Sequence, residues 1–158
     1  MVSRHKGPLV AWRLADSRHP VFSGAGASFY GGRWNSPGYP VIYGAASFAC
    51  AMLEKLVHAG IGKVPKNQVA VRIDIPGKVE IEEIGDSDVP GWDREDLMAS
   101  RAYGDVWLRS GRTCVLLVPS VVVPHEKNLL INEMHADFRQ IAPGPLEPVK
   151  WDRRLFEA

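Results

Sequence analysis

The sequence VIYGAASFACAMLEKLVHAG, residues 41–60, decides how this chain folds. Its apolar start predicts a buried strand over Val41–Gly44. A helix is predicted over Ser47–Ala59, because Ser47 is a favourable N-cap and Gly60 suits the position that follows a helix. Nearly every position of this helix is apolar, so we expect it to be buried at the centre of the domain.

Short elements extend from this centre in both directions. Residues 15–39 are rich in Gly and Ser and are expected to form a long loop, whose aromatic residues argue against disorder. Apolar and polar residues alternate over Val69–Ile75, which predicts a half-buried strand. The other expected elements are strands at 9–14, 79–84, 113–118 and 121–123, and helices at 94–103 (capped by Asp93), 105–110 and 136–141.

The order of the elements and the composition together indicate the fold class. Strands and helices are mixed without a regular βαβ alternation, which favours an α+β fold over a doubly wound sheet. The chain has 158 residues and no visible linker, so we expect one compact domain over residues 1–158. Nineteen Lys and Arg against eighteen Asp and Glu give a net charge of +1. With so small a net charge, we expect no direct binding of nucleic acid.

The cysteines and the apolar segments indicate where the protein acts. Cys50 and Cys114 lie in apolar runs and resemble small core residues, and neither has a CxxC partner. We therefore expect no metal site and no disulfide, which fits a reducing cytoplasm. Leu9–Trp12 is too short for a signal peptide. The longest uncharged stretch, Ser36–Leu53, contains prolines and glycines and cannot form one membrane helix, so no membrane contact is expected.

Glu54 is the one carboxylate within the apolar helix, where it shares a face with Cys50 and Ala51. A carboxylate in such a place is costly unless it is paired or hydrogen-bonded. His58 lies four residues further on and can reach it. Two interpretations therefore stay open: a Glu54–His58 pair at the helix surface, or a carboxylate held in a functional cleft.

The segment GGRWNSPG, residues 31–38, is a second candidate. Gly31 and Gly32 allow a sharp turn or a close approach to a ligand. Arg33 offers a planar charged fork that suits phosphate or carboxylate, and Trp34 offers a stacking face. The segment is neither a GxGxxG fingerprint nor a P-loop, so an ordinary turn with a solvent-facing arginine remains the alternative.

Three further residues are candidates for a site. Ser120, in VPSVVVP at 118–124, is a small hydroxyl beside a kink set by Pro119. It does not lie in a G-x-S-x-G elbow, which disfavours hydrolase-type catalysis, and a satisfied core serine is the alternative. Arg13 of the first expected strand points either inward or to solvent. Tyr43 is either a core residue or a platform for a ring.

These residues in combination indicate more than each does alone. Two arginines, a tyrosine and an inward glutamate suit a ligand with a diphosphate, a flat ring and a ribose, as in a dinucleotide. The Rossmann fingerprint is absent, so the dinucleotide would be a substrate and not a hydride carrier. Cleavage of a ribose–nicotinamide bond passes through an oxocarbenium-like state, which a nearby carboxylate stabilises.

The sequence resembles the RES-domain family, the toxins of RES–Xre toxin–antitoxin systems, which is named after an Arg, a Glu and a Ser. These match Arg33 in GGRWNSPG, Glu54 in AMLEKLVH and Ser120 in VPSVVVP. The segments WRL, VIYGA, VRIDIP, GDVWLRSG and VPHEKNLLIN also resemble family positions, in the same order. One departure is the run at 132–136, NEMHA, where family members often carry Asn-Pro-x-His-Pro.

The resemblance implies a fold like that of ADP-ribosyltransferases, with a cleft between two small mixed sheets and flanking helices. It implies NAD as the substrate and an Xre-like antitoxin that covers the cleft. Of the site residues, Arg33, Glu54 and Ser120 would be catalytic. The NAD-binding residues it implies are Arg13, Arg33, Tyr43, Glu54 and Ser120.

Within this family we expect transfer of ADP-ribose to a cellular protein, since the aromatic loop before Gly31 can help to recognise a protein. In this hypothesis Arg33 clamps phosphate, Tyr43 packs on a ring and Glu54 supports the ribosyl cation. Ser120 would hydrogen-bond the phosphate or nicotinamide side. Degradation of NAD by hydrolysis or phosphorolysis is the alternative, and a non-catalytic nucleotide-binding module is a further one.

Overall fold

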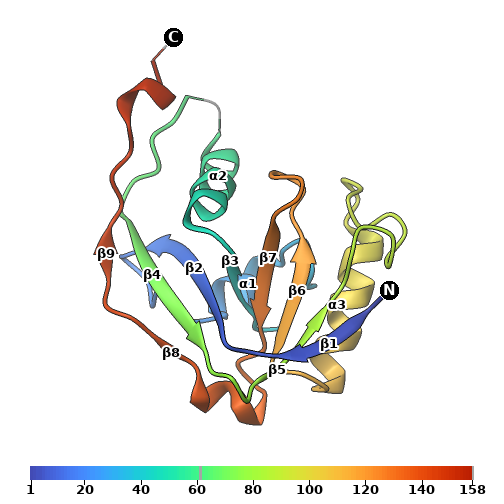
Figure 1. Ribbon diagram of the computed structural model, residues 1–158. Helices are drawn as coiled ribbons and strands as arrows, with labels where there is room; N and C mark the ends of the chain where they lie inside the picture. Colours follow the sequence, from blue (N-terminus) through green and yellow to red (C-terminus); the bar gives the residue numbers. More distant parts are fainter. Residues whose placement is uncertain (61, 158) are drawn as a thin grey trace.

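The computed structural model describes residues 1–60 and 62–157 (Figure 1). The strands are β1 (Ser3–Lys6), β2 (Leu9–Asp16), β3 (Ile42–Ala45), β4 (Gln68–Ile75), β5 (Glu80–Glu83), β6 (Val115–Pro119), β7 (Lys127–Ile131), β8 (Ala142–Pro143) and β9 (Glu147–Pro148). The helices are α1 (Ala25–Tyr30), α2 (Phe48–Ala59) and α3 (Met98–Ser110), with 3-10 turns at Ala136–Gln140 and Arg153–Leu155. The expected α+β class is confirmed.

All nine strands belong to one mixed sheet, in the order β1-β5-β6-β7-β3-β2-β4-β8, and β9 also pairs with β4. Strands β5 and β6 are parallel, whereas the other described pairs are antiparallel. The expectation of two separate small sheets is therefore wrong. Two halves exist, but the single register pair Trp12–Ala45 between β2 and β3 joins them into one hydrogen-bonded sheet.

Strand β6 shows how the sheet divides the core. Its residues are all buried, as the sequence predicts for this apolar run. Val115 and Leu117 pack into one hydrophobic cluster with residues of β4 and β7. Leu116 and Val118 face the opposite side, where they pack with Trp107 of α3 and with other aromatic residues. This alternation follows from the two-residue period of a strand, so α3 covers one face of the half-sheet that contains β6.

The third hydrophobic cluster holds α2 and the C-terminal segment against the other half of the sheet. Cys50 and Ala51 are the buried residues of α2. Trp12 of β2 packs edge-on against Phe48 of α2, with ring centroids 5.1 Å apart. Trp151 of the C-terminal segment packs against the same cluster. Figure 1 shows this segment, in red, running along β4 toward α2.

The predicted N-cap of α2 and the predicted strand β4 are confirmed. Ser47 caps α2, since its Oγ accepts a hydrogen bond from the backbone N–H of Cys50 at 3.1 Å. Strand β4 alternates as predicted, with Ile73 and Ile75 buried and Arg72 and Asp74 exposed. Both cysteines are free and buried. No described helix has the length and apolar character needed to cross a bilayer.

Helix α2 departs from its predicted environment. Nearly all its residues are apolar, yet Leu53 is 42% exposed and Val57 is 59% exposed. Only one side of the helix packs against the sheet, and the opposite side reaches the surface beside a pocket. The expectation of a fully buried helix is therefore wrong.

Three other segments differ from the prediction. The expected loop over 15–39 contains the short helix α1. The expected strand over Val121–Val123 is part of the connection between β6 and β7, because Ser120 bonds across this turn to Val123 and Glu126. The unpredicted strand β7 follows it.

Helix α3 starts later than expected. Its N-cap is Leu97, in a left-handed conformation with a φ of 61°, and not Asp93. Asp96 bonds to the backbone N–H of Met98 at 3.0 Å and so satisfies a free donor of the first turn. The expected helix at 136–141 is a 3-10 turn.

Gly104 lies where α3 crosses the segment that carries Arg33. A Cβ atom at Gly104 would overlap the backbone carbonyl of Trp34. The helix can approach this segment so closely only because residue 104 has no side chain.

We predict that Gly104→Ala lowers the free energy of unfolding by about 1–3 kcal/mol, as overpacking in a well-packed core does. Denaturant unfolding followed by circular dichroism would measure it. The matched control is Gly26→Ala, since Gly26 is also helical but a Cβ there meets no atom within 4 Å. Equal stability of the two variants would contradict the packing account.

Candidate active site

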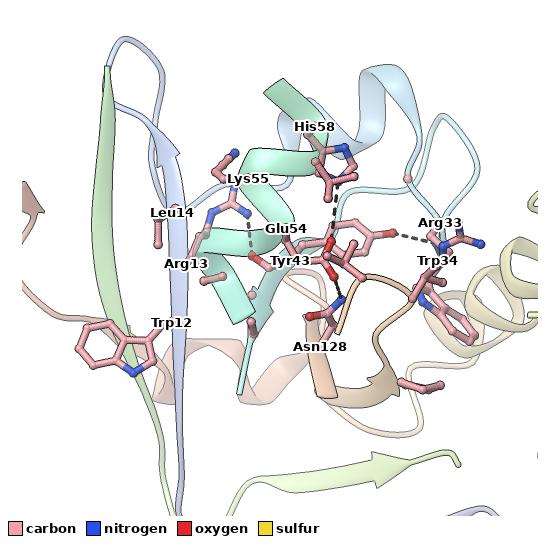
Figure 2. Close-up of a pocket in the computed structure, with 18 of the residues that line it drawn as sticks. Trp12, Arg13, Leu14, Arg33, Trp34, Tyr43, Glu54, Lys55, His58 and Asn128 are labelled. Atoms are coloured by element: carbon pink, nitrogen blue, oxygen red, sulfur yellow. Dashed lines mark hydrogen bonds and ion pairs between the residues drawn. The ribbon is translucent and has the colours of Figure 1, made fainter. Parts of the chain in front are cut away.

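A pocket of about 560 Å³ opens between the two halves of the sheet (Figure 2). Its walls come from β2, β3, α2, the segment around Arg33, the start of α3, the connection after β6 and Asn128 of β7. This volume lies in the range of small-molecule sites. Arg13, Arg33, Tyr43 and Glu54 all line it, although they lie on four different segments.

The turn at residues 31–38 is tightly held from within. Asn35 is completely buried, and its Nδ2 donates to the carbonyls of Ala27 at 2.8 Å and Tyr39 at 3.1 Å. Its Oδ1 accepts the hydroxyl proton of Tyr43 at 2.6 Å. A Cβ on Gly32 would lie 2.7 Å from that hydroxyl oxygen, so the tight approach requires glycine here. The alternative interpretation of residues 31–38, an ordinary turn with a solvent-facing arginine, does not account for these contacts.

Helix α3 fixes the same turn from outside. Asp105 accepts two hydrogen bonds from Ser36, one from its backbone N–H at 2.8 Å and one from its hydroxyl at 2.5 Å. Trp34 is 2% exposed and stacks on Trp92 with ring centroids 6.0 Å apart. Trp34 is therefore a core residue here, although part of it reaches the pocket wall.

Arg33 is oriented by backbone carbonyls and not by a carboxylate. Its Nη1 donates to the carbonyl of Trp92 at 3.1 Å and to that of Arg94 at 3.0 Å. No carboxylate of the described residues forms an ion pair with it. The other nitrogens of its guanidinium group thus remain available to a ligand.

Arg101 is a pocket residue that the sequence did not single out. It lies in the first turn of α3, and its Nε donates to the carbonyl of Gly32 at 2.8 Å. It shares a helix face with Asp105, four residues further on. That spacing is the only sequence signal that points to Arg101, and it does not show that both residues hold the turn at 31–38.

Glu54 is held by hydrogen bonds from two other segments. Its Oε1 accepts from the hydroxyl of Ser120 at 2.9 Å and from Nδ2 of Asn128 at 2.7 Å. The Nε2 of His58 lies 3.9 Å from the other oxygen, and the His58 side chain is 76% exposed. The surface pair Glu54–His58 therefore describes only the weakest of these contacts, and the carboxylate belongs to the pocket.

Ser120 lies behind Glu54. It is 4% exposed, and its hydroxyl accepts from the backbone N–H of Val123 at 3.0 Å while it donates to Glu54. It lines a neighbouring hollow of about 400 Å³ and does not line the main pocket. The structure thus joins Ser120 to the site through the Glu54 carboxylate.

Arg13 and Lys55 form the cationic side of the pocket near β2. Arg13 donates to the carbonyls of Val21 at 2.8 Å and Tyr43 at 2.7 Å. Burial lowers the pKa of Arg13 to about 10, and burial together with the charge of Arg13 lowers the pKa of Lys55. Arg13 therefore points inward, which decides between the two orientations left open by the sequence.

Tyr43 is both a core residue and a pocket residue, so it combines the two alternatives that the sequence left open. Its hydroxyl accepts from the backbone N–H of Trp34 at 3.0 Å. The residue packs against the hydrophobic cluster that contains Trp34, and it also lines the pocket. Burial raises the pKa of Tyr43, so the phenol stays neutral. Tyr43 thus supports the Arg33 turn and offers a face to a ligand.

The charges of the pocket are unbalanced. Arg13, Arg33, Lys55 and Arg101 line it together with the single carboxylate Glu54. Cations that are removed from water without carboxylate partners are costly, and a bound anion compensates them. Figure 2 shows Glu54 between Arg13 and Lys55 on one side and Arg33 on the other. Nowhere in residues 1–60 and 62–157 do three metal-binding side chains gather.

Comparison with known proteins identifies several relatives. A model of the RES domain family matches residues 10–152. The "Prs ADP-ribosylating toxin" of Sphingobium sp. (strain YBL2) is 40% identical over 154 residues, covering 92% of this chain and 95% of that protein. A "Toxin Res" from Yersinia enterocolitica is 38% identical over 153 residues, and the match covers 93% of this chain and 99% of the other.

One solved structure has a similar fold. It is described as the "Crystal structure of the M.tuberculosis MbcT-MbcA toxin-antitoxin complex", and it aligns with a TM-score of 0.74 at 19% identity. The alignment covers 97% of this chain and 89% of the matched chain. At this identity the likeness supports the fold alone.

We predict that Tyr43→Phe lowers the free energy of unfolding by about 1–3 kcal/mol, since it leaves the Trp34 N–H and the Asn35 Oδ1 without a partner. Chemical denaturation would measure the change. Tyr30→Phe is the matched control, because Tyr30 is 77% exposed. If both variants were as stable as the wild type, Tyr43 would not support the turn.

Proposed function

Because the chain belongs to the RES domain family, we propose that it is a bacterial toxin that cleaves NAD and transfers ADP-ribose to a cellular protein. A relative that carries the name of an ADP-ribosylating toxin, at 40% identity, supports the transferase activity. The observation that carries the proposal is that Arg33 and Glu54, from separate segments, line one pocket with an excess of cations.

The arginines on the α3 side would bind the diphosphate of NAD. The guanidinium groups of Arg33 and Arg101 are each fixed by backbone carbonyls, so their remaining N–H groups are oriented in advance. A planar guanidinium can make two parallel hydrogen bonds to a phosphate. The ring of Tyr43 would pack against a flat ring of the ligand.

Glu54 would act on the ribose that bears the nicotinamide. As the bond between the anomeric carbon and nicotinamide breaks, the electron pair leaves with nicotinamide and positive charge develops on the ribose. The carboxylate of Glu54 would stabilise this charge and accept a hydrogen bond from a ribose hydroxyl. A nucleophile of the acceptor protein would then bond to the anomeric carbon and release its proton to solvent.

A second candidate reaction is degradation of NAD with a small acceptor. Arg13 and Lys55 lie on the side of Glu54 away from Arg33 (Figure 2). Cations on both sides of the carboxylate suit a diphosphate on one side and an inorganic phosphate on the other. In this reaction phosphate, or water for hydrolysis, would take the place of the protein nucleophile.

We predict that Glu54→Gln lowers kcat for nicotinamide release by about 10²–10³, by analogy with the loss of a single charge-stabilising group. We expect Arg33→Ala to raise the Kd for NAD, since it removes a phosphate contact. Liquid chromatography of free nicotinamide and calorimetric titration with NAD would measure these effects. Arg72→Ala is the matched control, because Arg72 is exposed on β4 outside the pocket.

Labelled NAD separates the candidates in the same assay. Label on a protein after incubation with cell extract supports transfer, whereas labelled small products formed with phosphate or in water support degradation. If the wild type binds NAD but releases no more nicotinamide than Glu54→Gln under any of these conditions, the enzymatic proposal is wrong. The chain would then be a nucleotide-binding module.

The protein would act in the cytoplasm with a cognate antitoxin, of the Xre-like type, that covers the pocket. Val57 and Val121 line the pocket and are 59% and 42% exposed, so its mouth is partly apolar. An antitoxin segment that covers them would exclude NAD.

We predict that adding a purified candidate antitoxin suppresses nicotinamide release in proportion to the amount of complex formed, which size-exclusion chromatography would measure. Full activity within the complex would contradict this arrangement.

A further inference from the structure

Asn128 is a half-buried contact of Glu54 at the pocket wall, and the family resemblance does not include it. It lies in β7, where its backbone is in register with Ala45 of β3 on one side and Val118 of β6 on the other. A residue paired on both sides in a sheet has little freedom to move. Its Nδ2 reaches Glu54 of α2 at 2.7 Å, the shortest of the three polar contacts of that carboxylate.

Both hydrogen bonds to the carboxylate end on the same oxygen, Oε1. The hydroxyl of Ser120 has one proton, and it accepts from the N–H of Val123, so the proton is directed to Glu54. No side chain of the described residues donates a hydrogen bond to Oε2, and the ring nitrogen Nε2 of His58 lies 3.9 Å from it. The second oxygen is thus left for a ligand.

The amide of Asn128 is itself oriented. The thiol of Cys50 lies 3.6 Å from its Oδ1. Burial raises the pKa of the Cys50 thiol to about 11, so the sulfur keeps its proton and donates. With the thiol on the oxygen side, the NH₂ group of Asn128 faces Glu54.

We infer that Asn128 is a positioning residue, which together with Ser120 holds one oxygen of Glu54 and thereby aims the other at the ribose of the substrate. This inference rests on the proposed NAD-cleaving function. It also gives Ser120 a role that requires no contact with the substrate, since its one proton is already used.

The test is Asn128→Asp, which keeps the shape of the side chain but replaces the NH₂ donor by an oxygen that repels the Glu54 carboxylate. We expect kcat for nicotinamide release to fall by about 10²-fold, as a displacement of the order of 1 Å does. The KM for NAD should change little, because Arg33 and Arg101 are untouched. A kcat within twofold of the wild type, in a folded variant, would overturn the inference.

Asn132→Asp is the matched control. Asn132 is a buried asparagine just beyond the other end of β7, away from the pocket, and it bonds to the carbonyl of Leu108 and the N–H of Met134. We expect this variant to lose stability and to keep its kcat. An equal loss of kcat in both variants would show a general effect of buried charge and overturn the inference.

Ser120→Ala serves if Asn128→Asp does not fold. It removes one of the two donors to Oε1, so we expect a smaller loss of kcat with KM again unchanged. An unchanged kcat would overturn the shared role of the two residues.

A double-mutant cycle separates this inference from the proposed function. If the wild type releases no nicotinamide, the proposed function fails, but the contact can still be measured in unfolding. We expect Asn128→Ala and Glu54→Ala together to shift the urea midpoint by less than the sum of the single shifts, since both remove the same bond. Additive shifts would show that the two side chains do not interact.

Discussion

The site depends on one constraint: the turn at residues 31–38 must stay between β3 and α3. Asn35 fills the inside of this turn with hydrogen bonds to backbone carbonyls, and Asp105 holds it from the helix. Gly32 and Gly104 allow the two close approaches. Arg33 projects from the turn and gains its orientation from the carbonyls of residues 92 and 94. Without this attachment, the arginine and Glu54 would have no fixed distance between them.

The second determinant is the charge of the pocket. Burial lowers the pKa of Lys55 and lowers the pKa of Arg13 to about 10. Among the residues that the structure describes, no carboxylate forms an ion pair with Arg13. The fold thus holds cations in a place where their burial costs stability, and the proposed binding of an anionic ligand would offset that cost. Glu54 remains close to them because Ser120 and Asn128 satisfy one of its oxygens.

The sequence predicted the parts of the fold that local chemistry determines. Ser47 is recognisable as an N-cap, and the alternation in β4 is recognisable as a strand, because each signal lies within a few residues. The strand β7 was missed because its first two residues, Lys127 and Asn128, are polar. The exposure of α2 was missed because composition does not reveal which side of a helix faces a pocket.

The candidate site, like the fold, could be predicted only where a local sequence pattern marks the residue. The sequence names Arg13, Arg33, Tyr43, Glu54 and Ser120 as candidates, and the structure gathers them at one pocket or directly behind it. Arg101 and Asn128 were not found, because their importance arises only from contacts with Gly32 and Glu54, far away along the chain. No local pattern marks a residue whose role is to hold another one.

The most direct test of the account is a crystal structure of the Glu54→Gln variant with NAD. We predict a single NAD molecule whose diphosphate contacts Arg33 and whose nicotinamide ribose contacts residue 54. Contact of these two residues with separate molecules, or NAD bound outside the pocket, would contradict the account.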